Sequence, residues 1–261
     1  MIDLQEALAV AIEAAREAGA VLQEWATKFT VKEKSRANLV TEADVNAQEA
    51  IVSVIRGRYP DHSFLGEEDL NIAGAKSENR WIIDPLDGTT NYVHGFPFYA
   101  VSIALECAGV LTVAVIYDPT RDEVFSAIKG RGAFLNGKPI TPSEIGPLSD
   151  GFCVASLPVG AKGNELQVAQ FLRVLPHART VQRTGSAALN LSYVACGRID
   201  AYWSGSLKPW DQAGGALLVT EAGGKISKFD GSTFDVDLPN LLASNGRELH
   251  DELSKLLVVP T

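Results

Sequence analysis

The spacing of hydrophobic residues near the start of the chain predicts two amphipathic helices. In residues 3–26 the apolar side chains recur every three or four positions, which is the period of one helical face. A second helix is predicted to begin after Thr41, because Thr41 and Asp44 fit a capping box, and to end at Tyr59-Pro60. Each helix is expected to pack its apolar face against the core.

Short apolar segments in the next part of the chain predict strands. Residues 63–66 are expected to form a strand that ends at the acids Glu67 and Glu68, and residues 81–83 form another that stops at Asp84. Turn sequences such as Asp-Pro-Thr-Arg separate three later segments, so these are predicted to be antiparallel. They are Tyr99–Leu105, Val110–Tyr117 and Glu123–Ile128.

A passage rich in proline and glycine, residues 139–149, is the best candidate for a boundary between two halves, 1–145 and 146–261. After it the pattern alternates between strands and helices, so an α/β half is expected to follow an α+β half. The predicted strands are 152–156, 178–182, 199–203 and 241–244, and the predicted helices are 164–175, 186–196, 211–222 and a terminal one.

The composition narrows the function classes. With 261 residues, 46% of them hydrophobic, the chain can bury a large core, and it has neither an apolar run long enough for a membrane span nor a signal-peptide pattern. Cys107, Cys153 and Cys196 are widely spaced among apolar residues, as expected of reduced thiols in a cytoplasmic protein. A net charge of −9 without a Lys/Arg cluster argues against nucleic acid as the main ligand.

The stretch Asp84-Pro-Leu-Asp-Gly-Thr-Thr-Asn91 carries the strongest chemical signal. Asp84, Asp87 and the carbonyl of Leu86 can face one point, and such oxygen ligands suit a hard cation such as Mg²⁺. Gly88 permits a tight turn, and a helix that opens at Thr89 would direct its first N–H groups at an anion. A metal ion and a phosphate are therefore expected side by side.

This stretch also has interpretations other than a metal site. The two aspartates can simply cap a turn and a helix. An EF-hand loop is excluded, since its ligand positions would hold Leu86 and Gly88. Phosphatases that form an aspartyl phosphate use D-x-D-G-T, with one residue between the acids instead of two, so a nucleophilic aspartate is the alternative chemistry.

Two further segments stand at predicted helix starts in the second half. Gly185-Ser-Ala187 opens one helix, and Trp210-Asp211 opens another ahead of a glycine pair. Considered alone, Gly185-Ser-Ala187 can be explained as a turn into a helix, and Asp211 can be explained as an N-cap.

Taken together, the set resembles the inositol monophosphatase family of Mg²⁺-dependent, lithium-sensitive phosphatases. The matching segments are Gly66-Glu-Glu68, Asp84–Asn91 with Phe96-Pro-Phe98 after it, and Trp210-Asp211, in the order and at about the spacing of the family. The resemblance covers nearly the whole chain, and the long middle motif is the specific part. It implies a layered α-β-α-β-α sandwich, a homodimer, and a site in the cleft between the two halves.

Carried over position by position, the resemblance assigns roles to individual residues. Two or three Mg²⁺ ions would offset the mutual repulsion of the acids, one ion lowering the pKa of a water molecule and another, near Asp211, stabilising the departing alkoxide. The implied metal ligands are Glu67, Asp84, the Leu86 carbonyl, Asp87 and Asp211. The implied phosphate cradle consists of Leu86, Asp87, Gly88 and Thr89, and the attacking water is positioned by Glu67, Thr89 and Asp44. The alcohol part of the substrate would contact Gly185, Ser186 and Ala187.

The substrate is the least determined property. Members of the family that select inositol phosphate carry a glutamate seven residues before the second-half aspartate, and here that position is Ser204. We therefore expect inositol 1-phosphate and related small sugar or polyol phosphates to be hydrolysed with little discrimination. Alternatives are a main substrate such as fructose 1,6-bisphosphate, histidinol phosphate or a nucleotide 3′-phosphate, or a binding partner that keeps the fold without catalysis.

Overall fold

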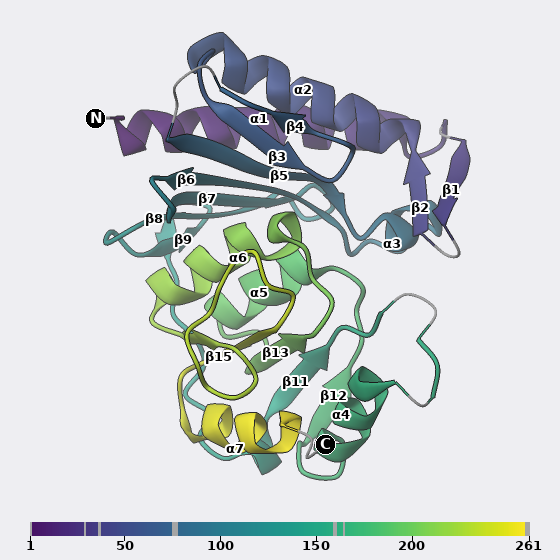
Figure 1. The fold of residues 1–261 in the computed structure, drawn as a ribbon, viewed down its shortest axis with the longest axis vertical. Helices are drawn as coiled ribbons and strands as arrows, with labels where there is room; N and C mark the ends of the chain where they lie inside the picture. The colour runs from purple at the N-terminus through teal and green to yellow at the C-terminus, as the bar shows by residue number, and fades with distance from the viewer. Residues whose placement is uncertain are drawn as a thin grey trace.

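The protein consists of five alternating layers of helices and sheets (Figure 1). The computed structural model describes residues 2–28, 30–35, 38–74, 78–158, 161–163 and 165–258. Helices α1 (Leu4–Trp25) and α2 (Glu42–Arg58) form the first layer, an eight-stranded sheet the second, and α5 (Ala187–Ala195) with α6 (Pro209–Ala222) the third. A five-stranded sheet and the helices α4 (Leu166–Val174) and α7 (Glu248–Leu257) complete the stack. The predicted α-β-α-β-α sandwich is confirmed.

The eight-stranded sheet is antiparallel except where β3 and β5 run parallel. Its order is β10-β9-β8-β7-β6-β5-β3-β4. The strands are β3 (Ser63–Gly66), β4 (Asn71–Ile72), β5 (Asn79–Asp87), β6 (Ala100–Cys107), β7 (Val110–Asp118), β8 (Glu123–Ile128), β9 (Ala133–Leu135) and β10 (Lys138–Pro139). The short helix α3 (Thr89–Val93) directly follows β5, and a separate hairpin of β1 (Val31–Ser35) and β2 (Asn38–Thr41) precedes α2.

The five-stranded sheet is parallel on one side and antiparallel on the other. Strand β11 (Phe152–Ala155) pairs in parallel with β12 (Thr180–Gln182) and with β13 (Ala201–Ser204). On the other side of β13 lie β15 (Leu241–Ser244) and β14 (Lys225–Ser227), both antiparallel to their neighbours. The predicted start of a helix at residue 164 lies outside the described residues; α4 is observed from Leu166.

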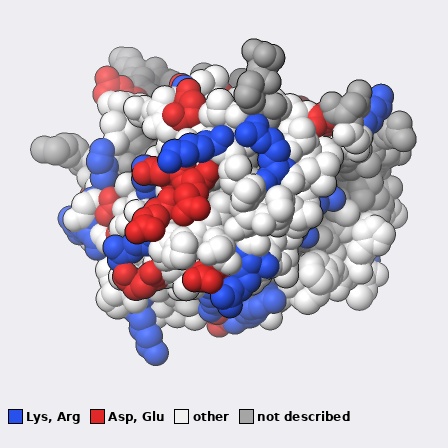
Figure 2. Space-filling model, turned by 90° about the horizontal axis from the view of Figure 1, so that it is seen from below, with Lys and Arg blue, Asp and Glu red and all other residues white. Residues whose placement is uncertain are grey.

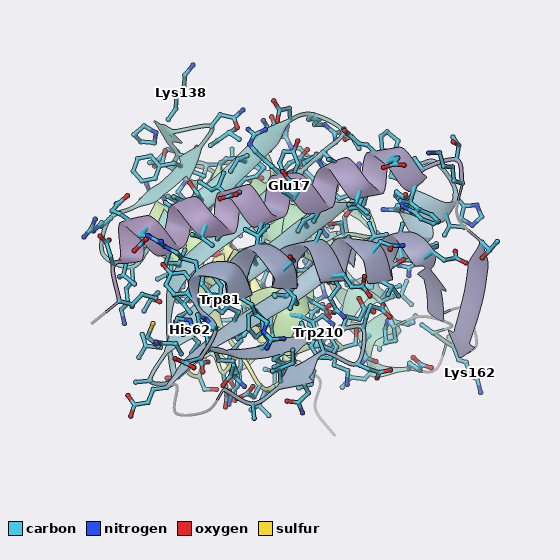
Figure 3. All side chains as sticks on the ribbon, turned by 90° about the horizontal axis from the view of Figure 1, so that it is seen from above. Glu17, His62, Trp81, Lys138, Lys162 and Trp210 are labelled. Carbon is cyan, nitrogen blue, oxygen red and sulfur yellow. The ribbon has the colours of Figure 1, made fainter. Side chains whose placement is uncertain are left out.

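Helix α1 packs closely because its buried stripe is made of small side chains. The alanines at positions 7, 11, 14, 15 and 18 are all fully buried, and α1 lies beside α2 over the first sheet (Figure 3). The capping box predicted for α2 is present, with the Asp44 carboxylate accepting from the backbone N–H of Thr41 at 2.8 Å. Beneath these helices the indole of Trp81 donates to His62 Nδ1 at 3.0 Å.

The two sheets share one hydrophobic cluster through the middle helical layer. Ile116 and Phe125 of the first sheet, Leu218 of α6, and Tyr202 and Ala243 of the second sheet belong to the same buried cluster. The helices α5 and α6 are apolar on both sides, since they are covered by a sheet on each face. One buried cluster thus extends through both sheets and the helical layer between them.

The outer surface below the second sheet is mixed in charge. Figure 2 shows acidic side chains gathered beside Lys and Arg on this face. In the second half of the chain Arg179 pairs with Asp150 at 2.8 Å and Lys225 with Asp251 at 2.9 Å. On the described residues of this face no broad basic surface is seen. Across the described chain, no helix combines the length and the apolar character that crossing a membrane requires.

Candidate active site

A bulge at the end of β5 turns two aspartates to the same side. The pairing of β5 with β6 joins Asp84 to Ser102 and Asp87 to Ala100, so the two residues between the aspartates lie opposite a single residue of β6. Side chains three residues apart on a regular strand lie on opposite faces, and the extra residue cancels that alternation. Pro85 lies inside the irregular stretch, where its missing N–H costs no ladder hydrogen bond. The motif Asp-Pro-Leu-Asp therefore presents Asp84 and Asp87 together.

Asp87 is held by the second half of the chain. Its Oδ2 accepts hydrogen bonds from Ser186 Oγ at 2.5 Å and from the backbone N–H of Ala188 at 2.7 Å. Ser186 is also the N-cap of α5, accepting from the N–H of Leu189. The negative charge of Asp87 thus lies at the N-terminus of that helix, where the helix dipole favours it.

Asp211 is brought to the same place by the close packing of α6. Its Oδ2 accepts from the backbone N–H of Lys208 at 2.7 Å, which fixes the first turn of the helix. A β-carbon at Gly214 would lie 3.0 Å from Ser102 Oγ, and one at Gly215 would lie 2.3 Å from Leu191. Only glycine at these two positions lets α6 approach both β6 and α5 this closely.

Four acids converge on this point. Burial, followed by the charges of Glu67, Asp87 and Asp211, raises the pKa of Asp84 well above its usual range. Burial is also the largest cause of the raised pKa of Asp87 and of Asp211, and the Asp211 and Asp84 side chains hydrogen-bond to each other. Such repulsion between buried carboxylates disfavours their charged forms.

The donor set fits magnesium. The carboxylates of Glu67, Asp84, Asp87 and Asp211 and the Leu86 carbonyl are hard oxygen ligands, and bound cations would offset the repulsion between the acids. Among the described residues, no group of three or more His, Cys, Asp or Glu is already arranged to hold an ion. Three of the acids also accept hydrogen bonds from the protein: Asp84 Oδ1 accepts from the N–H of Leu86 at 3.0 Å, and Asp87 and Asp211 each accept from a backbone N–H with one oxygen.

Thr89 and Asp44, which both belong to the first half of the chain, lie next to the acids. Thr89 Oγ1 lies 3.2 Å from the Leu86 carbonyl and 3.4 Å from Asp44 Oδ1. Asp44 is buried, which raises its pKa to about 6 against the opposing hydrogen bonds from Thr41. The capping role of Asp44 and a position beside Thr89 therefore coexist, since the two carboxylate oxygens face different partners.

A cavity of about 500 Å³ opens in front of Asp87 and Asp211. Its other walls are the loops that follow β11, β12 and β13, because the carboxyl ends of these parallel strands meet at one edge of the sheet. They contribute Ser156–Pro158, Arg183–Gly185 and Ser206–Leu207, with Ala187 and the α3 residues Thr90 and Asn91. A larger hollow of about 930 Å³ lies elsewhere, between Arg80 and Phe234, and includes none of the converging acids.

The structure changes two expectations for substrate contacts. Ser204 is fully buried at the end of β13, where its Oγ accepts from the N–H of Ser206, so the chain meets the cavity at Ser206 and Leu207 instead. Ser186 is also fully buried; its hydroxyl donates to Asp87 and caps the start of α5. Gly185 and Ala187 do line the cavity, as does Arg183, which the sequence reasoning missed.

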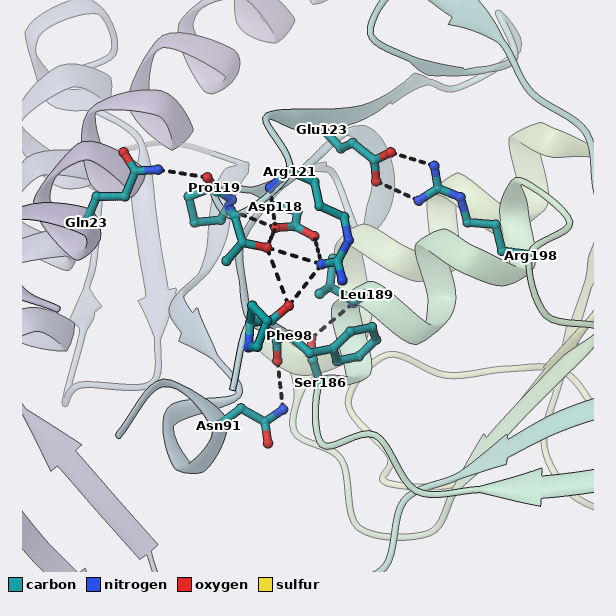
Figure 4. Close-up of polar contacts among 12 residues, drawn as sticks. Gln23, Asn91, Phe98, Asp118, Pro119, Arg121, Glu123, Ser186, Leu189 and Arg198 are labelled. Carbon is teal, nitrogen blue, oxygen red and sulfur yellow. Dashed lines mark hydrogen bonds and ion pairs between the residues drawn. The ribbon is translucent and has the colours of Figure 1, made fainter. Parts of the chain in front are cut away.

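Asn91 connects the two halves beside the cavity. Its Nδ2 donates to the carbonyl of Phe98 at 2.7 Å, as drawn in Figure 4, and to the carbonyl of Thr184 at 2.9 Å. Gly185 takes a φ of 93°, and a β-carbon there would lie 2.9 Å from the Asn91 side chain. The last residue of the Asp84–Asn91 motif thus fixes the loop after β12.

Comparison with known proteins agrees with this geometry. The sequence profile of the inositol monophosphatase family matches residues 3–259. The chain is 41% identical to inositol-1-monophosphatase of Synechocystis sp., over 98% of this chain and 90% of that protein, and 40% identical to the Nus factor SuhB of Pseudomonas aeruginosa, over 93% and 92%. Among solved structures, the inositol monophosphatase of Anabaena (Nostoc) sp. superposes with a TM-score of 0.88 at 38% identity, covering 98% of this chain and 96% of that one. The extragenic suppressor protein SuhB of Bartonella henselae gives 0.93 at 36%, with coverage of 98% and 100%.

Proposed function

We propose a metal and a substrate class for this protein, on the basis that the chain belongs to the inositol monophosphatase family and is a phosphatase that hydrolyses phosphoric monoesters. In this proposal it is a Mg²⁺-dependent enzyme that acts on inositol 1-phosphate and related small sugar or polyol phosphates. The observation that carries the proposal is the buried carboxyl of Asp84, which is subject to the charges of Glu67, Asp87 and Asp211, the last two of which line a cavity. Buried like charges without compensation are costly, so the cluster is suited to cations.

The residues would divide the work of an in-line displacement. Glu67, Asp84, Asp87, Asp211 and the Leu86 carbonyl would hold two or three Mg²⁺ ions. When bound there, Mg²⁺ neutralises phosphate charge and lowers the pKa of a water molecule. The backbone at Gly88 and Thr89 would cradle the phosphate, while Glu67 and Thr89, with Asp44 behind Thr89, orient the attacking water and accept its proton.

Gly185 and Ala187 would contact the alcohol part of the substrate, because both line the cavity. With Ser204 buried, no carboxylate is placed at that position to bind ring hydroxyls. A physiological substrate other than inositol 1-phosphate, such as fructose 1,6-bisphosphate, histidinol phosphate or a nucleotide 3′-phosphate, is compatible with the same acids.

The decisive experiment measures phosphate release from inositol 1-phosphate with and without Mg²⁺ for the unmodified protein and for Asp84→Asn and Asp87→Asn. Each change removes a charge that the proposed ions need, so activity should fall by about a hundredfold or more. Asp230→Asn, an exposed acid in a surface turn, is the matched control. Turnover that is independent of Mg²⁺, or full activity in Asp84→Asn, would refute the proposal.

Two observations separate this chemistry from its alternatives. A second ion near Asp87 and Asp211 predicts inhibition by LiCl in the millimolar range that matched NaCl does not reproduce. A phosphorylated aspartate trapped by acid quench would instead favour the nucleophilic mechanism, in which Asp84 or Asp87 attacks the phosphorus directly.

A further inference from the structure

The charges around the cavity are unevenly distributed. Asp87 and Asp211 form its acidic wall, and the remaining lining is neutral except for Arg183. In the described lining Arg183 is thus the single cation, and it comes from the loop after β12, on the opposite half of the chain from Asp87. A substrate whose phosphate lies at the acids and their cations would extend its remaining part along the neutral walls.

The backbone that carries Arg183 is fixed, whereas its guanidinium is not engaged. The next residue, Thr184, accepts from Asn91 Nδ2 at 2.9 Å through its carbonyl and donates from Oγ1 to Asn190 at 2.7 Å. Arg183 itself is exposed, and within the described part of the chain its side chain has neither an ion pair nor a hydrogen bond. Two arginines of the same half do have acidic partners: Arg179 pairs with Asp150 at 2.8 Å and Arg198 with Glu123 at 2.5 Å.

An arginine whose backbone is fixed and whose guanidinium group is free is suited to bind an anion. The guanidinium presents a planar fork of donors that matches a carboxylate or a phosphate with two parallel hydrogen bonds. A neutral polyol would gain little from this group. In a chain with a net charge of −9, a local cation also offsets the general repulsion of a multiply charged substrate.

We infer that Arg183 is a specificity-determining residue that binds a second anionic group, so that the cavity favours phosphorylated sugars or polyols bearing a further phosphate or carboxylate. The inference rests on the phosphatase function proposed above for the same cavity. The acids and their cations receive the phosphate that is cleaved, and Arg183 receives the second group without taking part in the cleavage.

The test compares pairs of substrates that differ only in the second anionic group. The phosphate arm pairs fructose 1,6-bisphosphate with fructose 1-phosphate, and the carboxylate arm pairs 2-phosphoglycerate with glycerol 2-phosphate. In Arg183→Gln, kcat/KM for the doubly anionic member of the recognised pair should fall roughly ten- to a hundredfold, while its partner changes less than about twofold. Arg183→Lys should recover part of the loss, because it restores the charge but not the fork. The arm that responds identifies the second group.

Arg56→Gln is the matched control, since it removes the same charge from the last turn of α2, away from the cavity. An equal loss for both members of each pair, or no loss for any, would overturn the inference while leaving the phosphatase function intact. If the unmodified protein hydrolyses none of the four compounds with Mg²⁺, the proposed function fails instead. Calorimetric binding of the same compounds to Glu67→Gln, with and without Arg183→Gln, then decides the role of Arg183 independently of turnover.

Discussion

The hydrogen bond from Ser186 to Asp87 shows how one buried hydroxyl can set the charge state and orientation of an acid in the proposed active site. It gives Asp87 Oδ2 a short, charge-assisted donor inside the core. In Ser186→Ala the carboxylate keeps its burial but loses this donor, so its charged form is less stable and its orientation is less fixed. We expect the Mg²⁺ concentration for half-maximal activity to rise about tenfold.

The matched control is Ser192→Ala, which removes a fully buried hydroxyl of the same helix whose hydrogen bond goes to the Ala188 carbonyl. A Mg²⁺ titration of the two variants and the unmodified protein measures the effect. If both serine variants need the same Mg²⁺ concentration, the contact with Asp87 has no bearing on the ion site.

His250 predicts a loss of stability in mild acid. Its ring is buried; Ser244 Oγ lies 2.8 Å from Nδ1, and Ser227 Oγ, whose proton goes to the Lys228 carbonyl, lies 2.9 Å from Nε2. The neutral ring with its proton on Nε2 therefore satisfies both serines. Burial, and then the charge of Lys225, lowers the pKa of His250 to about 4.

Because the folded-state pKa lies below the ordinary value of 6.5, the unfolded chain binds the proton more readily. The stabilisation is complete above pH 6.5 and is lost as the pH falls towards 4. Urea unfolding at pH 7 and pH 5 should show a larger decrease for the unmodified protein than for His250→Asn, by on the order of 1–2 kcal/mol. His177→Asn, at an exposed position, is the control; an equal pH dependence in His250→Asn would contradict the assignment.

At the scale of residues, the acids were predictable and the cavity wall was not. Asp84 and Asp87 could be singled out because both acids follow an apolar strand and precede Gly88. Asp211 alone can be explained as an N-cap, and only the resemblance of the ordered segments to the family assigned it to the site. Whether Ser204 faces a ligand depends on how β13 enters the following turn, which no local pattern encodes. Arg183 was missed because a lone exposed arginine carries no sequence signal until the loop after β12 is seen beside the acids.

At the scale of elements, hydrogen bonds to Glu221 link the middle helical layer to the first sheet. Its carboxylate accepts from the backbone N–H groups of Gly130, Arg131 and Gly132 at 2.9, 3.1 and 3.0 Å, and so joins α6 to the turn between β8 and β9. In Glu221→Ala three donors lose their acceptor. The turn is partly exposed, so water replaces part of the loss, and the free energy of unfolding should decrease by about 1–2 kcal/mol.

Chemical denaturation of Glu221→Ala beside Glu17→Ala, an exposed glutamate on α1, measures this contribution (Figure 3). Equal stability of the two variants would show that water accepts hydrogen bonds from the three N–H groups as favourably as the Glu221 carboxylate does.

The elements that could be predicted are those with their own periodicity. The long helices and the strands β5 to β8 agree with the sequence pattern. Strands β4, β9, β10 and β14 were not predicted; they have two or three residues each and lie at or near sheet edges, so pairing with a neighbour specifies them more than composition does. The parallel pairing of β3 with β5 was also beyond local signals, since the two strands are neighbours in the sheet although β4 lies between them in the sequence.

At the scale of the whole molecule, the shared core predicts a single cooperative unfolding transition. The division into residues 1–145 and 146–261 remains a prediction about sequence organisation, and the buried cluster that joins both sheets argues against independent unfolding of the halves. Trp81 in the first sheet and Trp203 in the second are both buried and can report on each half.

Variants that retain only Trp81 or only Trp203 should each show urea transitions by fluorescence that coincide with the loss of helix by circular dichroism. The midpoints measured by the two methods should agree within about 0.3 M. A fluorescence transition for one tryptophan that precedes the loss of helix would indicate that the halves separate before they unfold.

The placement of the acids and of the cavity loops on different sheets has a consequence for how such an enzyme can diversify. Asp84 and Asp87 are fixed by the bulge of β5, whereas Ser156–Pro158, Arg183–Gly185 and Ser206–Leu207 are loops at the carboxyl edge of the other sheet. Mutations in these loops can change the compound that is accepted while the acids of the proposed site keep their positions. Descendants of one ancestral gene could therefore acquire new substrates by loop replacement, with selection acting on the loops and the acids inherited unchanged.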